Sequence, residues 1–80
     1  MKIKELEQRL IIEGIPKNSY CIYGGFPWEA YCLNEYYGTW EVYYSEKGNK
    51  TGLKLFKNED EACEYFYNKL ISDLKIMGII

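Results

Sequence analysis

The sequence contains no histidine, and it shows no serine-centred nucleophile motif, no phosphate-binding loop and no spaced set of metal ligands. Acid–base catalysis needs a group that titrates near neutral pH, and without histidine the candidates are buried carboxylates such as Glu29, Glu41 or Glu46. Nothing in the pattern isolates one of them, so each is interpreted as a solvated charge. The sequence therefore predicts a protein that is not an enzyme and holds no metal or cofactor.

A long apolar segment and a basic stripe are also missing. No run approaches the roughly 18 apolar residues that a membrane span needs, and residues 1–7 lack the apolar core of a signal peptide. Ten basic residues, scattered along the chain, stand against twelve acidic ones. This balance disfavours binding to nucleic-acid phosphates. We expect a cytoplasmic protein that binds neither membrane nor nucleic acid directly.

The cysteines form no recognisable framework. There are three of them, an odd number, and no CxxC pair. Neither a set of disulfides nor a zinc site is predicted, and free thiols are expected in a reducing compartment.

Aromatic residues, in contrast, are abundant. The chain holds nine Tyr, two Trp and three Phe in 80 residues, which is the length of one domain, 1–80. A domain this small cannot bury so many rings, so some must lie on the surface. Because exposed Tyr and Trp side chains are enriched at recognition surfaces, the composition predicts a binding protein.

An amphipathic helix is predicted near the start of the chain. Ile3, Leu6 and Leu10 recur at helical spacing, and Gly14 offers a stop, so the helix spans about residues 2–13.

A second helix is predicted near the end, over about residues 59–76. Asn58 is a suitable N-cap, and Glu61 three residues later completes a pattern like a capping box. Its apolar face consists of Ala62, Cys63, Phe66, Leu70, Ile71, Leu74 and Met77.

Between the helices the apolar period changes from 3.6 to 2, which indicates strands. Four segments are bounded by Gly or polar turn residues: 20–23, 30–34, 39–45 and 50–56. The predicted fold class is α+β: an N-terminal helix, a four-stranded antiparallel sheet and a C-terminal helix, with both helices packed on one sheet face.

Turns at residues 35–38 and 46–49 would place Leu33 opposite Trp40 and Leu53 opposite Val42. The face toward the helices would then hold Tyr20, Ile22, Tyr31, Leu33, Trp40, Val42, Tyr44, Leu53 and Leu55. The other face would hold Cys21, Tyr23, Ala30, Cys32, Glu41, Tyr43 and Lys54. In this register Glu41 pairs with Lys54 and Cys21 lies opposite Cys32.

The candidate binding residues are the rings outside this predicted core, together with one acid. Phe26 and Trp28 lie in a loop, Tyr36 and Tyr37 at a hairpin tip, and Tyr23, Tyr43 and Glu41 on the outer sheet face. A homodimer, a covering loop or the C-terminal tail that buries some of these rings is the alternative interpretation.

A family resemblance supports the binding interpretation. Residues 40–48, Phe56 and residues 61–63 at the start of the last helix, with residues 14–16 after the first helix, resemble small immunity proteins of bacterial polymorphic-toxin systems. The resemblance implies a cytoplasmic protein that binds a cognate protein toxin and blocks it.

Two other functions are compatible with the same residues. In the first, Tyr23, Trp28 and Tyr43 stack on a planar, nucleotide-like small molecule. In the second, the chain is a phage-type inhibitor of a bacterial defence enzyme. The acidic residues 59–61, with Glu64, could imitate a phosphate backbone, although a helix N-terminus stabilised by its own dipole is the simpler explanation.

Overall fold

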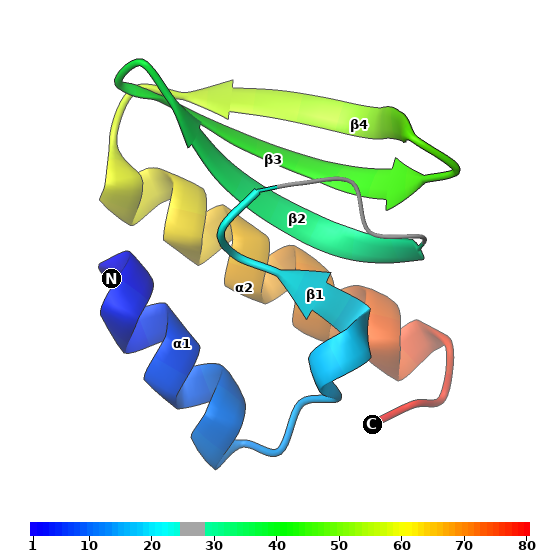
Figure 1. Cartoon of the computed structure of the whole chain (residues 1–80). Helices are drawn as coiled ribbons and strands as arrows, with labels where there is room; N and C mark the ends of the chain where they lie inside the picture. Colours follow the sequence, from blue (N-terminus) through cyan, green and yellow to red (C-terminus); the bar gives the residue numbers. More distant parts are fainter. Residues whose placement is uncertain (25–28) are drawn as a thin grey trace.

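The computed structural model describes residues 1–24 and 29–80. The elements in chain order are α1 (Ile3–Ile12), the 3₁₀ helix η1 (Lys17–Ser19), β1 (Tyr20–Cys21), β2 (Glu29–Tyr36), β3 (Thr39–Glu46), β4 (Asn49–Phe56) and α2 (Glu59–Ile76). The sheet forms one layer and the two α-helices form the other (Figure 1). The helix–sheet–helix order confirms the α+β class.

Both predicted helices form where the apolar spacing placed them. The α1 helix is one residue shorter at each end than the predicted 2–13, and α2 has the predicted bounds. The predicted cap is also present, because the Asn58 side chain accepts a hydrogen bond from the Glu61 N–H at 2.8 Å. Within the described ranges, neither helix is both long and apolar enough to cross a membrane.

The strand order is β1-β2-β3-β4, but the sheet is mixed. The predicted antiparallel pairing of the first strand is wrong, since β1 runs parallel to β2 with Cys21 beside Cys32. The Gly24 N–H donates to the Leu33 carbonyl at 3.1 Å. The chain therefore continues alongside β2 as far as Leu33.

The β2–β3 hairpin turns more tightly than predicted. Tyr36 pairs with Thr39 and Leu33 with Val42, so only Tyr37 and Gly38 form the turn, not residues 35–38. The predicted Leu33–Trp40 pairing is therefore wrong. The error shifts the register by an even number of residues, so the same side chains still face the helices.

A bulge in β4 changes the other hairpin. Thr51 pairs with Tyr44 but Lys54 pairs with Val42, so Gly52 and Leu53 together lie opposite Tyr43. Gly52 has φ +65°, a conformation that glycine adopts without strain and that is typical of such bulges. The extra residue turns every later side chain of β4 to the opposite face.

The expectation that Leu53 and Leu55 belong to the core is therefore wrong. They are 45% and 60% exposed, and Phe56 packs toward the helices instead. Lys54 also lies on the helix side, where its ammonium stands 5.6 Å from the centre of the Tyr65 ring. The predicted pair between Glu41 and Lys54 does not form, since Leu55 occupies the place opposite Glu41.

The main core lies between the sheet and the helices. The α2 helix packs across β2, β3 and β4, whereas α1 packs chiefly against α2. The expectation that both helices rest directly on the strands is thus met in part. The buried residues of this core are Leu6, Leu10, Ile15, Ile22, Leu33, Val42, Ala62, Cys63, Phe66, Leu70 and Leu74.

The opposite face of the sheet is partly buried as well. Ala30, Cys32, Tyr43 and Ser45 alternate with the core-facing residues, and all four side chains are buried. The part of the expected exposed face that these four residues form is therefore not accessible, whereas the face carries exposed side chains at the β2–β3 turn and along β4.

Candidate functional site

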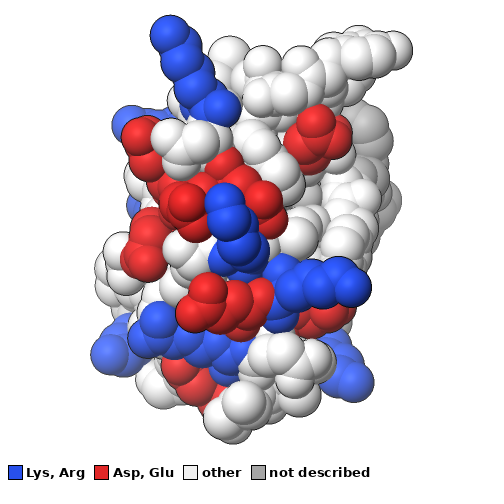
Figure 2. All heavy atoms as spheres, turned by 90° about the vertical axis from the view of Figure 1, so that its left-hand side faces the viewer, with Lys and Arg blue, Asp and Glu red and all other residues white. Residues whose placement is uncertain are grey.

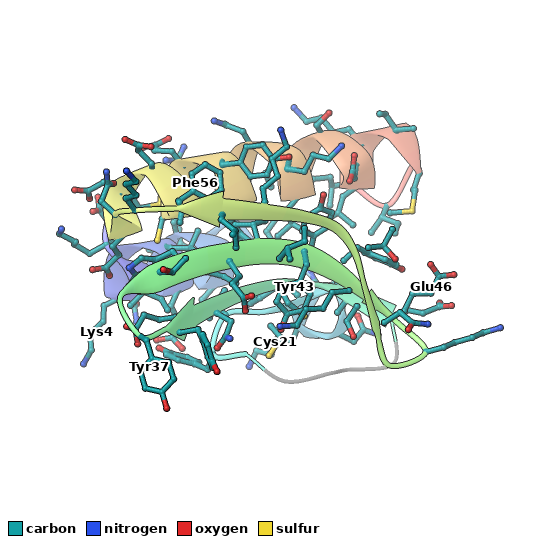
Figure 3. All side chains as sticks on the ribbon, turned by 90° about the horizontal axis from the view of Figure 1, so that it is seen from above. Lys4, Cys21, Tyr37, Tyr43, Glu46 and Phe56 are labelled. Carbon is teal, nitrogen blue, oxygen red and sulfur yellow. The ribbon has the colours of Figure 1, made fainter. Side chains whose placement is uncertain are left out.

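The β2–β3 turn carries Tyr37, the most exposed ring of the described chain, and the neighbouring exposed ring of Tyr36. Tyr37 and Gly38 have φ of 49° and 82°, as a two-residue hairpin turn with positive φ at both positions requires. The Tyr36 and Tyr37 rings meet edge to face, with centroids 4.6 Å apart. They are 62% and 90% exposed, and Tyr37 projects from the end of the sheet (Figure 3).

Leu53 and Leu55 are exposed apolar side chains elsewhere on the same face of the sheet. The bulge at Gly52 turns them to the same outer face as Tyr36, and the register sets Leu55 beside Glu41. We call Tyr36, Tyr37, Leu53 and Leu55 the outer apolar patch. Sequence reasoning found the tyrosines and missed the leucines. The available signal was Gly52, because a glycine inside a strand often marks a bulge.

Glu41 lies next to the outer apolar patch in a polar network. Its Oε1 accepts hydrogen bonds from Asn34 Nδ2 at 3.0 Å and from Lys50 Nζ at 3.1 Å. Its side chain is only 14% exposed. The hydrogen bond from Asn34, followed by the hydrogen bond and charge of Lys50, holds the pKa of Glu41 below its ordinary value. Glu41 is therefore a fixed, ionised group on β3, between Tyr36 of β2 and Leu55 of β4.

Tyr43 does not lie on the surface. It sits in the middle of β3, 1% exposed, so the expectation of an accessible ring is wrong (Figure 3). The Lys50 ammonium stands 4.7 Å from the centre of its ring. Burial raises the pKa of the Tyr43 hydroxyl, and the neighbouring Cys32 raises it further. Tyr43 is therefore a buried residue of the outer face and not an accessible contact.

Tyr23 is exposed but lies at the other edge of the sheet. Its hydroxyl donates to Glu7 Oε1 of α1 at 3.2 Å, and the ring borders an open hollow that Ile11 and Tyr20 also line. It is not among the outer apolar patch residues. Phe26 and Trp28, the remaining predicted contacts, lie outside the described residues.

The acidic residues at the start of α2 already have partners within the fold. Glu59 accepts from the Ile3 N–H at 2.7 Å, and Asp60 pairs with the N-terminal ammonium and Lys2 at 2.9 and 3.3 Å. Around these helix starts acidic and basic side chains interleave (Figure 2). This arrangement favours the structural explanation of residues 59–61 over imitation of a phosphate backbone.

The cysteines carry no sign of activation. All three are free thiols, and burial raises the pKa of Cys32 and of Cys63 to about 11. Cys32 and Cys63 are therefore protonated at neutral pH. In residues 1–24 and 29–80 no cluster of acidic or cysteine ligands has metal-binding geometry.

No protein-family model, curated protein or solved structure that we compared with the chain matches it. The geometry of the described residues is therefore the basis for assigning a function.

Proposed function

We propose that this chain binds a protein partner through the outer apolar patch and inhibits it, as a small immunity protein inhibits a cognate bacterial toxin domain. The observation that carries the proposal is the position and exposure of Tyr37. It occupies a turn position with φ 49°, where Asn or Gly is favoured, and its ring is 90% exposed. Tyrosine is not a residue that this turn position favours, so we interpret its exposed ring as a binding element.

The surroundings of Tyr37 suit a protein interface. Aromatic and aliphatic anchors beside a polar rim are the usual arrangement of binding hot spots. The outer apolar patch supplies the anchors, and the Asn34–Glu41–Lys50 network supplies the adjoining polar groups.

The shape of this surface favours a protein over a small molecule. The patch lies on a hairpin tip and an open sheet face. The structure has a cavity lined by Tyr31 and Tyr44 and the hollow beside Tyr23, and neither includes any residue of the patch. Small ligands prefer concave sites. A toxin domain is the partner that the family resemblance implies, and occlusion of its active site or of a nearby surface is the proposed mode of inhibition.

Co-expression tests the proposal. The chain is produced together with the toxin domain encoded beside its gene, and survival and pull-down of a complex are scored. We expect protection and a stable complex. Protection without a complex would contradict direct binding, and a complex without protection would contradict inhibition.

The alternative functions make different predictions. A nucleotide-like ligand stacked on Tyr43 is disfavoured, because that ring is 1% exposed. A phage-type inhibitor would use the same patch on a defence enzyme, so it is distinguished by the partner that the complex contains.

A further inference from the structure

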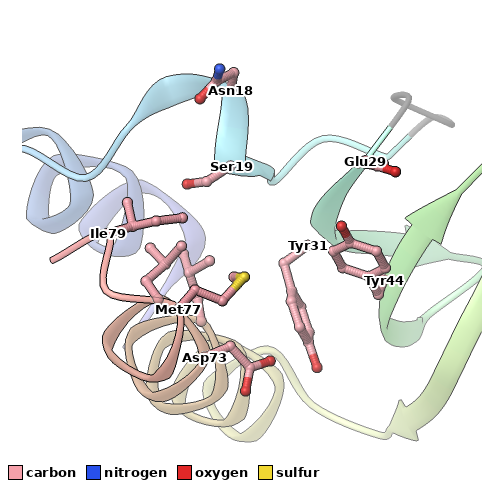
Figure 4. Close-up of a pocket in the computed structure, with 10 residues that line it drawn as sticks. Asn18, Ser19, Glu29, Tyr31, Tyr44, Asp73, Met77 and Ile79 are labelled. Carbon is pink, nitrogen blue, oxygen red and sulfur yellow. The ribbon is translucent and has the colours of Figure 1, made fainter.

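A cavity of about 290 Å³ lies at the opposite end of the sheet from Tyr37, between the strands, η1 and the end of α2 (Figure 4). Its lining residues are Asn18, Ser19, Glu29, Tyr31, Tyr44, Leu70, Asp73, Leu74, Met77 and Ile79. None of them was predicted as a site residue. This volume is near the lower end of the range for small-molecule sites.

One wall of the cavity is apolar and aromatic. Leu70, Leu74 and Met77 come from α2, and Tyr31 and Tyr44 come from the helix-facing side of the sheet. The two rings meet edge to face with centroids 5.9 Å apart. Such rings attract cations through their faces.

Among the described residues of the lining, the charged groups are all acidic. They are Glu29, on the sheet side, and Asp73, on α2. Asp73 has a basic contact in Lys69, one helical turn earlier on α2, whose ammonium lies 3.5 Å from Asp73 Oδ1. The distance is long for an ion pair and the Lys69 side chain is exposed, so the pair is weak; it engages one oxygen of the carboxylate.

A like-charge pair adds to this acidity. Glu29 and Glu46 lie directly opposite each other on β2 and β3, an arrangement that destabilises a sheet. In the part of the chain that the structure describes, neither has a basic side chain within ion-pair distance. Burial and then the charges of Glu29 and Glu46 raise the pKa of Tyr44. Burial and then the charge of Asp73 raise the pKa of Tyr31 to about 12.

We infer that this cavity binds a small organic cation: a protonated amine whose ammonium faces Glu29 and Asp73 and whose apolar part rests on Leu70, Leu74 and the tyrosine rings. A phosphate-bearing ligand is disfavoured, because the described lining presents carboxylates to it and no basic side chain. A metal ion is disfavoured as well, because the acids of the described residues do not converge with ligand geometry. This inference is independent of the outer apolar patch.

The direct test is a titration of the isolated protein followed by ¹H–¹⁵N NMR. The probes are 2-phenylethylammonium, neutral 2-phenylethanol, anionic phenylacetate and adenosine monophosphate. The ammonium compound should bind at least about tenfold more tightly than the alcohol and shift the amide signals of Tyr31, Tyr44 and Asp73. Equal binding of the alcohol, stronger binding of either anion, or no shift at these positions would overturn the inference.

A pair of variants tests the acidic groups. Glu29→Gln/Asp73→Asn should weaken binding of the ammonium probe by about tenfold or more. Glu5→Gln/Glu64→Gln removes the same charge outside the cavity and should bind as the original protein does. Spectra recorded before titration confirm that each variant is folded, and the comparison of probes on the unmodified chain needs no variant at all. Unchanged binding by the folded cavity variant would refute the assignment.

Discussion

The side chain of Glu59, at the start of α2, accepts a hydrogen bond from the backbone N–H of Ile3, at the start of α1, at 2.7 Å. The two residues are far apart in sequence, and α1 has no side-chain cap from its own N-cap residue, Lys2. One helix therefore caps the other. This contact fixes the two helix starts side by side, beneath the end of the sheet that carries Tyr37.

Loss of this cap should destabilise the fold. Glu59→Ala leaves the Ile3 N–H without its acceptor, and we expect a loss of about 1 kcal/mol in the free energy of unfolding. The measurement is a urea titration. The control is Glu64→Ala, an exposed acid on the same helix, which should change stability by less than about 0.5 kcal/mol. Equal effects of the two variants would contradict the capping role.

The core assignment predicts opposite results for two apolar residues. Phe66 is fully buried, and Phe66→Ala should cost about 3–5 kcal/mol through lost burial and a cavity. Leu55 is 60% exposed because of the bulge, so Leu55→Ala should cost less than about 1 kcal/mol. A large loss for Leu55→Ala in the same denaturant titration would instead support the regular register without a bulge.

Acid should weaken the fold partly through Glu41. Its pKa is lowered in the folded state, so it stabilises the protein above its ordinary pKa of 4.5, and that contribution disappears as the pH falls through the folded value. Glu41→Gln should therefore reduce the loss of stability on acidification. Urea titrations at neutral pH and at successively lower pH measure it, with Glu64→Gln as the control. Identical pH profiles for Glu41→Gln and the original chain would show that the network is not formed in solution.

The thiols should react at very different rates. Cys21 is partly exposed, whereas burial holds Cys32 and Cys63 as protonated thiols with pKa values of about 11. Brief alkylation of the folded protein should modify Cys21 first, and all three cysteines should react after unfolding. Mass spectrometry of freshly purified protein counts the modified thiols. A single reactive thiol after unfolding would instead indicate a bridge between Cys21 and Cys32, which are neighbours in the sheet.

The proposed binding surface can be separated from folding at Tyr37. Tyr37→Asn places a residue that tolerates positive φ in the turn, so the free energy of unfolding should stay within about 0.5 kcal/mol or rise. Binding to the partner should weaken by about 2 kcal/mol or more. Calorimetry on the purified complex measures this loss, with Ile76→Ala, an exposed side chain outside the outer apolar patch, as the control. Unchanged affinity for Tyr37→Asn would remove the main support for the patch.

Local signals in the sequence were sufficient for the helices and for much of the sheet. The spacing of Leu6 and Leu10, and the cap at Asn58, placed both helices because they depend on interactions within a few residues. The alternation along β2 and β3 placed Leu33 and Val42 on the helix side even though the turn length was wrong, since only the parity of the register decides the face. The exposure of Tyr36 and Tyr37 followed from their position at a hairpin tip.

The remaining features were decided by tertiary structure. The parallel pairing of β1, the burial of Tyr43 and the cavity around Tyr31 each depend on segments that meet only in the folded chain. The bulge at Gly52 depends on both local sequence and tertiary structure. The glycine is visible in the sequence, but its effect on Leu53 and Leu55 depends on which strand pairs with β4. Local spacing fixes what each element is and which of its faces is apolar, whereas pairing across the sheet fixes which side chains remain exposed.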